Sequence, residues 1–146
     1  MATTDTTTLA GQLVLFSLGE DDYALPIGSV HEIIRYVEPR SISSNSPWVR
    51  GVISLRGKIV PICDLAAQLG QTRNHDAASA KIVILDTEHG TVGVIVDNVD
   101  EVRTVEPDAV DTAPGTGTPA IAGIAKLDDR LVVLLDPEAI TANLDI

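Results

Sequence analysis

Hydrophobic and polar residues along this chain alternate, or hydrophobic residues cluster, in short stretches separated by turn residues. Successive side chains of a strand point to opposite faces of a sheet, so short runs of this kind rich in Val, Ile and Leu predict β-strands. Ten segments fit: 13–18, 23–27, 33–37, 51–55, 59–63, 81–85, 91–96, 101–105, 121–127 and 131–135. We therefore predict a mainly β protein.

The links between these runs have the composition of tight turns. They read GEDD at 19–22, RG at 56–57, EHG at 88–90 and DD at 128–129. Gly and Asp favour the backbone conformations that close two-stranded hairpins. We expect four antiparallel hairpins.

Helical signals are scarce and short. Asp64 is placed to cap the segment LAAQLG, and Ser46-Pro47 and Asp136-Pro137 each resemble a cap followed by a first-turn proline. The apolar residues of SVHEIIRYV, 29–37, fit both helical and strand spacing. We interpret this segment as a strand preceded by a single turn.

The chain contains an internal repeat. EIIRYVEP at 32–39 returns as EVRTVEP at 101–107, and GVISLRGKIVPICD from Gly51 matches GIAKLDDRLVVLLD from Gly123. Two similar five-strand units account for this pattern, and units this small need a buried seam between them. Curled five-stranded sheets close into small barrels.

Composition narrows the possible partners and the cellular compartment. The 10 Lys and Arg against 21 Asp and Glu give a net charge of −11, which repels nucleic acid and anionic lipid. Cys63 is the only cysteine, and no apolar run is long enough to cross a membrane. We expect a cytosolic protein with a flexible tail at 1–11, a linker at 71–79 and a loop at 112–119.

Four stretches resemble the CheW family of chemotaxis coupling proteins. They are LVLFSLGEDDYALPIGSVHEIIR, PWVRGVISLRGKIVPICDL, VGVIVDNVDEV and GIAKLDDRLVVLLD, which occur in the order typical of the family. The resemblance extends from about residue 12 to residue 140, and RGVISLRGKIVPICDL is its most specific part. Ser54 and Cys63 depart from the family pattern, which usually has Asn and an aliphatic residue there.

The resemblance implies a fold, an activity and partners. The fold is two intertwined five-stranded SH3-like β-barrels in one domain at 12–140, with subdomains at about 12–75 and 80–140, possible strand exchange and a C-terminal tail at 141–146. The activity is that of a non-enzymatic adaptor without a cofactor or metal. Its partners are the regulatory SH3-like domain of the histidine kinase CheA and the cytoplasmic tips of chemoreceptors, with self-association in membrane-associated receptor arrays also possible.

The resemblance also assigns a receptor-binding surface. Its residues are Val30, Glu32, Arg56, Gly93, Val99 and Val102, with Gly57 allowing the turn that presents Arg56. The fork of donors on an arginine suits carbonyl and carboxylate groups on a helical partner. Taken alone, Arg56 reads as a solubilising charge on a turn, Glu32 as an outward strand residue, and Val99 and Val102 as core.

Two other functions remain open at this point. A small-molecule-binding or hydrolytic barrel would use Cys63 with a nearby histidine, although a lone cysteine in an apolar run is typical of a core residue. The regulatory module of the kinase shares the same fold, but the initial Met and the chain length favour a freestanding protein.

The remaining candidate motifs have plainer interpretations. The histidines at 31, 75 and 89 are too scattered to ligate one metal, and Glu20-Asp21-Asp22 lacks the alternating ligands of a calcium loop. PGTGTP has no lysine and no following helix to hold phosphate. Trp48, the single tryptophan, is expected in the core.

Overall fold

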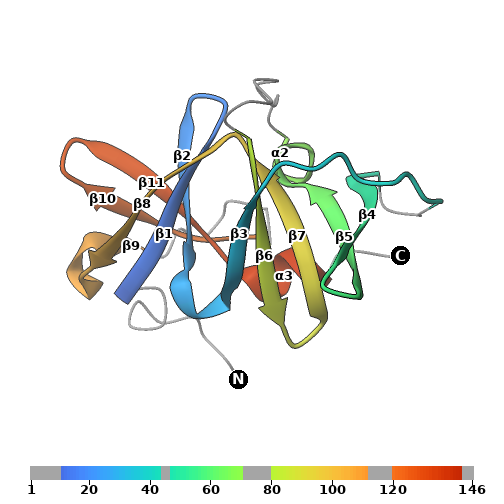
Figure 1. Cartoon of the computed structure of the whole chain (residues 1–146). Helices are drawn as coiled ribbons and strands as arrows, with labels where there is room; N and C mark the ends of the chain where they lie inside the picture. Colours follow the sequence, from blue (N-terminus) through green and yellow to red (C-terminus); the bar gives the residue numbers. More distant parts are fainter. Residues whose placement is uncertain (1–10, 44–46, 71–79, 112–119, 143–146) are drawn as a thin grey trace.

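The computed structural model describes residues 11–43, 47–70, 80–111 and 120–142, which fold into two β-sheets with short helical turns (Figure 1). In spatial order, the six-stranded sheet contains β8 (Asn98–Val105), β1 (Gly11–Leu18), β2 (Asp21–Pro26), β11 (Arg130–Leu135), β10 (Ile121–Leu127) and β9 (Val110–Asp111). The five-stranded sheet contains β3 (Val30–Arg35), β6 (Lys81–Thr87), β7 (Gly90–Val96), β5 (Lys58–Asp64) and β4 (Val49–Leu55). The helical elements are η1 (Ile27–Ser29), α2 (Leu65–Gln68), η2 (Pro107–Ala109) and α3 (Pro137–Ala142).

Each sheet combines strands from both halves of the chain. The β1–β2 hairpin pairs with β8 and β11 of the second half, and the β6–β7 hairpin pairs with β3 and β5 of the first half. The two crossover pairs, β2 with β11 and β5 with β7, are parallel, whereas the other strand pairs are antiparallel. The mainly β, intertwined fold class is therefore confirmed, with β9 as an additional short strand.

The described residues form three hydrophobic cores, one within each sheet and one that joins the two sheets. One core, including Leu15 and Val132, lies within the six-stranded sheet, and another, including Ile62 and Ile84, lies within the five-stranded sheet. The third, which we call the junction core, joins the sheets and consists of Phe16, Leu18, Tyr23, Leu25, Cys63, Leu65, Ala66, Val83, Leu85, Val92, Val94, Val96, Ala120, Leu135 and Ile140. This shared core is the buried seam predicted from the repeat.

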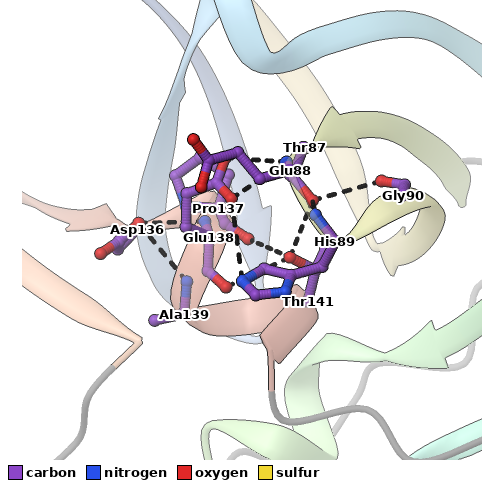
Figure 2. A network of polar contacts seen from close by, with 9 residues as sticks. All are labelled: Thr87, Glu88, His89, Gly90, Asp136, Pro137, Glu138, Ala139 and Thr141. Carbon is purple, nitrogen blue, oxygen red and sulfur yellow. Dashed lines mark hydrogen bonds and ion pairs between the residues drawn. The ribbon is translucent and has the colours of Figure 1, made fainter.

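The C-terminal helix α3 ties one sheet to the other. It continues from β11 of the six-stranded sheet, and its Ile140 is fully buried in the junction core. Figure 2 shows α3 against the β6–β7 turn, where the Glu138 carboxylate accepts the N–H of Glu88 at 3.1 Å. The hydroxyls of Thr87 and Thr141 lie 2.9 Å apart. The end of the chain thus contributes directly to the contact between the sheets.

The predicted caps and strands are mostly confirmed. The Asp64 carboxylate accepts the N–H of Ala67 at 3.2 Å, and the Asp136 carboxylate accepts the N–H of Glu138 at 3.0 Å. All ten predicted strands are present, although the strand expected over 33–37 spans Val30–Arg35 after the turn η1. Trp48 is partly buried against the junction core. Ser46, the linker at 71–79, the loop at 112–119 and most of both tails lie outside the described residues.

Candidate functional site

Arg56 occupies a backbone conformation that few arginines adopt. It forms the β4–β5 turn with Gly57, and their φ angles are 51° and 81°. Two-residue hairpin turns of this handedness favour Asn, Asp or Gly because a side chain at positive φ is crowded by its own backbone. The matching turn between β10 and β11 has Asp128 at φ 55°, which is a favoured residue there. Unfavourable backbone conformations are concentrated at functional sites, which singles out Arg56.

Arg56 and Glu32 form an ion pair across the five-stranded sheet. The guanidinium Nη1 donates to Glu32 Oε1, and the side chain of Arg56 is 71% exposed whereas that of Glu32 is 20% exposed. The hydrogen bond and the negative charge of Glu32 raise the pKa of Arg56. Two residues that the sequence resemblance assigned to one surface are therefore in direct contact.

A hollow of about 290 Å³ lies beside this pair. It is lined by His31, Glu32, Leu55, Arg56, Lys58, Val60, Ile84, Asp86 and Thr91. Its aliphatic lining comes from β4, β5 and β6, and the charged or titratable residues come from β3, the β4–β5 turn, β5 and β6. Apolar walls combined with charged groups suit a protein partner that presents an apolar side chain next to a polar one.

The other predicted surface residues lie in several environments. Val30 and Val99 are partly buried and pack against the junction core from β3 and β8, so they belong to different sheets. Val102 on β8 is 51% exposed. The structure therefore places predicted contact residues on both sheets, and Val30 and Val99 each pack against the junction core.

Gly93 is buried in β7 within the five-stranded sheet. A Cβ atom added to it would lie 2.5 Å from Ile62 Cδ1 and 2.8 Å from Ile82 Cγ2. The isoleucines of the neighbouring strands thus occupy the space where a side chain would be. Gly93 is therefore placed among core side chains and not on the exposed face of the sheet.

The two most exposed large aliphatic residues among those described were not singled out by the sequence. Ile59 in β5 is 69% exposed and Leu131 in β11 is 63% exposed. They occupy matching positions of the internal repeat, each directly after a cation, Lys58 or Arg130. Alternation with the buried residues Val60 and Val132 is the sequence signal that would have placed both side chains outside.

The β10–β11 turn carries the acidic member of an ion pair, whereas the β4–β5 turn carries the basic member of one. Asp128 occupies the position that matches Arg56, and its carboxylate lies 3.0 Å from Arg103 Nη1 of β8. The hydrogen bond and positive charge of Arg103 lower the pKa of Asp128. Both turns therefore begin with a residue at positive φ, but that residue is basic in one turn and acidic in the other.

Cys63 lacks the features of a nucleophile. Its side chain is fully buried in the junction core, and burial, followed by the charge of Asp64, raises its pKa to about 12. A thiol must ionise before it attacks, so this environment disfavours the reactive form. Among the described residues no group of His, Cys, Asp and Glu side chains is arranged to hold a metal, and His75 lies outside them. In the same part of the chain, no helix is long and apolar enough to cross a membrane.

Comparisons with known proteins agree on one family. Residues 12–145 match the model of the CheW-like domain. The chain is 28% identical over 140 residues to the chemotaxis protein CheW of Klebsiella aerogenes, covering 93% of this chain and 84% of that protein. It is 30% identical over 133 residues to the chemotaxis protein CheW of Treponema pallidum, covering 86% and 78%. The crystal structure of the scaffolding protein TtCheW from Thermoanaerobacter tengcongensis superposes with a TM-score of 0.81 at 32% identity, covering 87% of this chain and 89% of that one.

Proposed function

Because this chain belongs to the CheW-like domain family, we propose that it couples the cytoplasmic tips of chemoreceptors to the histidine kinase CheA as a non-enzymatic adaptor. The chemotaxis proteins and the scaffolding protein it resembles support this role. The buried thiol of Cys63 adds a physical argument, because the hydrolytic alternative proposed this cysteine as its nucleophile.

The observation that carries the receptor-binding half of the proposal is the presentation of Arg56. Its guanidinium is held at the edge of an apolar hollow by Glu32, on a turn whose backbone is unfavourable for arginine. A fold that retains such a residue at this position keeps a fork of donors exposed for a partner. An acidic or carbonyl group on the receptor is the matching chemistry.

The receptor tip is expected to be helical, and an apolar surface edged with charges binds a helix well. Val30, Val99 and Val102 supply aliphatic contacts from both sheets, and Glu32 and Arg56 supply the charges. Gly93 supports this surface from below through the packing of β5, β6 and β7. The site is thus built from strands of both halves of the chain.

The exposed aliphatic residues Ile59 and Leu131 support the kinase-binding half of the proposal. They lie at matching positions of the β4–β5 and β10–β11 hairpins, one in each sheet, and each directly follows a cationic residue. A partner built from similar barrels would cover such a residue at either end of the molecule. The two ends are therefore the kinase-docking surfaces of this proposal.

Calorimetry with two separate partners tests both halves. Soluble fragments avoid the avidity of an array, which would hide part of any loss. Arg56→Ala should weaken binding of a receptor tip fragment about tenfold or more, because a charge-assisted hydrogen bond is lost. The same variant should bind the regulatory domain of CheA with unchanged affinity, because the apolar side chain of Ile59, which the proposal assigns to that partner, is not altered.

The control for this experiment is Arg35→Ala, which removes another exposed arginine of the five-stranded sheet. It should leave both affinities unchanged, and circular dichroism should show the same fold for both variants. Unaltered receptor affinity of Arg56→Ala would refute the assignment of Arg56. Failure of the native chain to bind either fragment would refute the adaptor function.

A further inference from the structure

His31 is the additional residue of a β-bulge in β3. Val30 pairs with Leu85 of β6 and Glu32 pairs with the preceding residue Ile84, so His31 has no partner of its own in the ladder. A bulge interrupts the regular alternation of side chains and redirects one of them. Here it allows two consecutive residues, His31 and Glu32, to line the same hollow.

The matching strand of the other sheet has a bulge at the same place in the repeat. Phe16 of β1 pairs with Val99, and Leu15 pairs with Glu101, which leaves Asp100 as the additional residue. Asp100 is also surrounded by charges, since burial and the charge of Asp22 raise its pKa while Arg130 opposes them. In both sheets, therefore, the additional residue of the bulge is titratable and lies near charged side chains: His31 lies near Glu32, and Asp100 lies near Asp22 and Arg130.

The side chains of Arg56 and His31 both approach one carboxylate oxygen of Glu32. Glu32 Oε1 accepts from Arg56 Nη1, and the same oxygen lies 3.9 Å from His31 Nε2. The His31 side chain is 59% exposed, so it can exchange protons with solvent. The other charged groups that face this hollow are Lys58 from β5 and Asp86 from β6.

We propose that His31 is a proton-sensitive positioning residue of the receptor-binding site, and that its protonated form competes with Arg56 for Glu32 and so frees the guanidinium for an acidic group on the partner. This inference rests on the proposed function. Histidine side chains gain charge as the pH falls from 8 to 5, whereas ordinary arginine, lysine and carboxylate side chains keep their charge over most of that range. Protonation also adds a positive charge beside Arg56, which acts in the same direction.

The expected sign is therefore tighter receptor binding at lower pH. Because exposed ion pairs contribute little, the affinity of a receptor tip fragment should be about two- to five-fold higher at pH 5.5 than at pH 8. His31→Gln should remove this dependence, and His31→Lys should hold the higher affinity at both pH values. His89→Gln, which removes an exposed histidine of the β6–β7 turn, should retain the native pH dependence.

A second measurement needs no partner. In nuclear magnetic resonance spectra of the free chain, the side-chain signal of Arg56 should shift with the same midpoint as the imidazole of His31. That shift should vanish in His31→Gln. An Arg56 signal that ignores the titration of His31, or a His31→Gln variant with the native pH dependence of binding, would overturn the inference.

The two measurements separate this inference from the proposed function. Coupled titration of His31 and Arg56 without receptor binding at any pH would support the competition for Glu32 but reject the receptor-binding role of the site. Receptor binding without coupled titration would leave the adaptor function standing and reject the role of His31.

Discussion

Substitution of Gly93 by alanine tests whether this residue acts through packing. The added Cβ would lie 2.5 Å from Ile62 Cδ1, 2.8 Å from Ile82 Cγ2 and 3.2 Å from Ile84 Cδ1. All three isoleucines are fully buried, so their side chains have little room to withdraw. The substitution should therefore strain the core of the five-stranded sheet without altering any exposed atom.

The magnitude follows from two opposing effects. Overpacking a dense core costs about 1–3 kcal/mol, whereas replacing glycine lowers the entropy of the unfolded chain and returns about 0.4–1 kcal/mol. The net of these ranges is about 0–2.6 kcal/mol, and because three fully buried side chains are contacted we expect Gly93→Ala to lower the free energy of unfolding by about 1–2 kcal/mol. The corresponding decrease in melting temperature is roughly 3–8 °C.

Urea unfolding followed by tryptophan fluorescence measures this change, since Trp48 is the only tryptophan and packs against the junction core. Ile62→Val removes the Cδ1 atom nearest to the new methyl group and alone should cost about 0.5–1.5 kcal/mol. The double variant should be more stable than the sum of the single changes predicts. Gly28→Ala is the control, because a Cβ there has no neighbouring atom within 4 Å.

Receptor affinity completes the test of Gly93. If packing is its role, Gly93→Ala should weaken binding and Ile62→Val should restore part of the loss in the double variant. Native stability of Gly93→Ala, or strictly additive free energies in the double variant, would refute the packing explanation. A stable Gly93→Ala variant with reduced binding would instead identify a direct contact.

Three further predictions concern other parts of the molecule. Cys63 should react with a thiol reagent only as fast as the native protein unfolds, because the thiol is buried and burial raises its pKa to about 12. Reaction in the native protein as fast as in the unfolded chain would contradict this. Asp100→Asn should stabilise the protein at pH 7. The raised pKa of Asp100 means that its ionised form is disfavoured in the folded state, so the gain should disappear as the pH falls below 4, and chemical denaturation across pH measures this. Glu138→Ala should speed hydrogen exchange at the Glu88 amide, whereas unchanged exchange there would show that α3 does not hold the β6–β7 turn.

Much of the local structure was predictable because it depends on neighbouring residues. The β4–β5 and β10–β11 hairpin turns follow from the short-range backbone preferences of Gly57 and Asp128, whereas Arg56 adopts its turn conformation against such a preference. The cap at Asp64 follows from a carboxylate placed before a helical turn. By contrast, β9 spans only two residues, and its pairing with β10 has no local signal.

The candidate site was predictable only in part. Resemblance to a family brought Glu32 and Arg56 together, and the structure adds that they form an ion pair. Gly93 shares the family pattern, but its position in β7 is buried. Its burial could not be predicted from alternation, because the residues around it in β7 form a continuous apolar run. The proposed role of His31 depends on a β-bulge between β3 and β6. A one-residue change of register between two strands distant in the chain cannot be predicted from the sequence of either strand alone.

The amino-acid sequence by itself determined a β-rich chain with a twofold repeat, hairpin turns at set places and two capped helical turns. These features arise from interactions within a few residues, so local spacing contains them. The family resemblance implied intertwined barrels, but only the tertiary structure decided which strands cross between the halves and that Glu32 and Arg56 pair beside a hollow. Pairing between strands that are far apart in the chain depends on the apolar surface that they bury together. That surface is formed only when the whole chain folds, so local sequence does not specify the pairing.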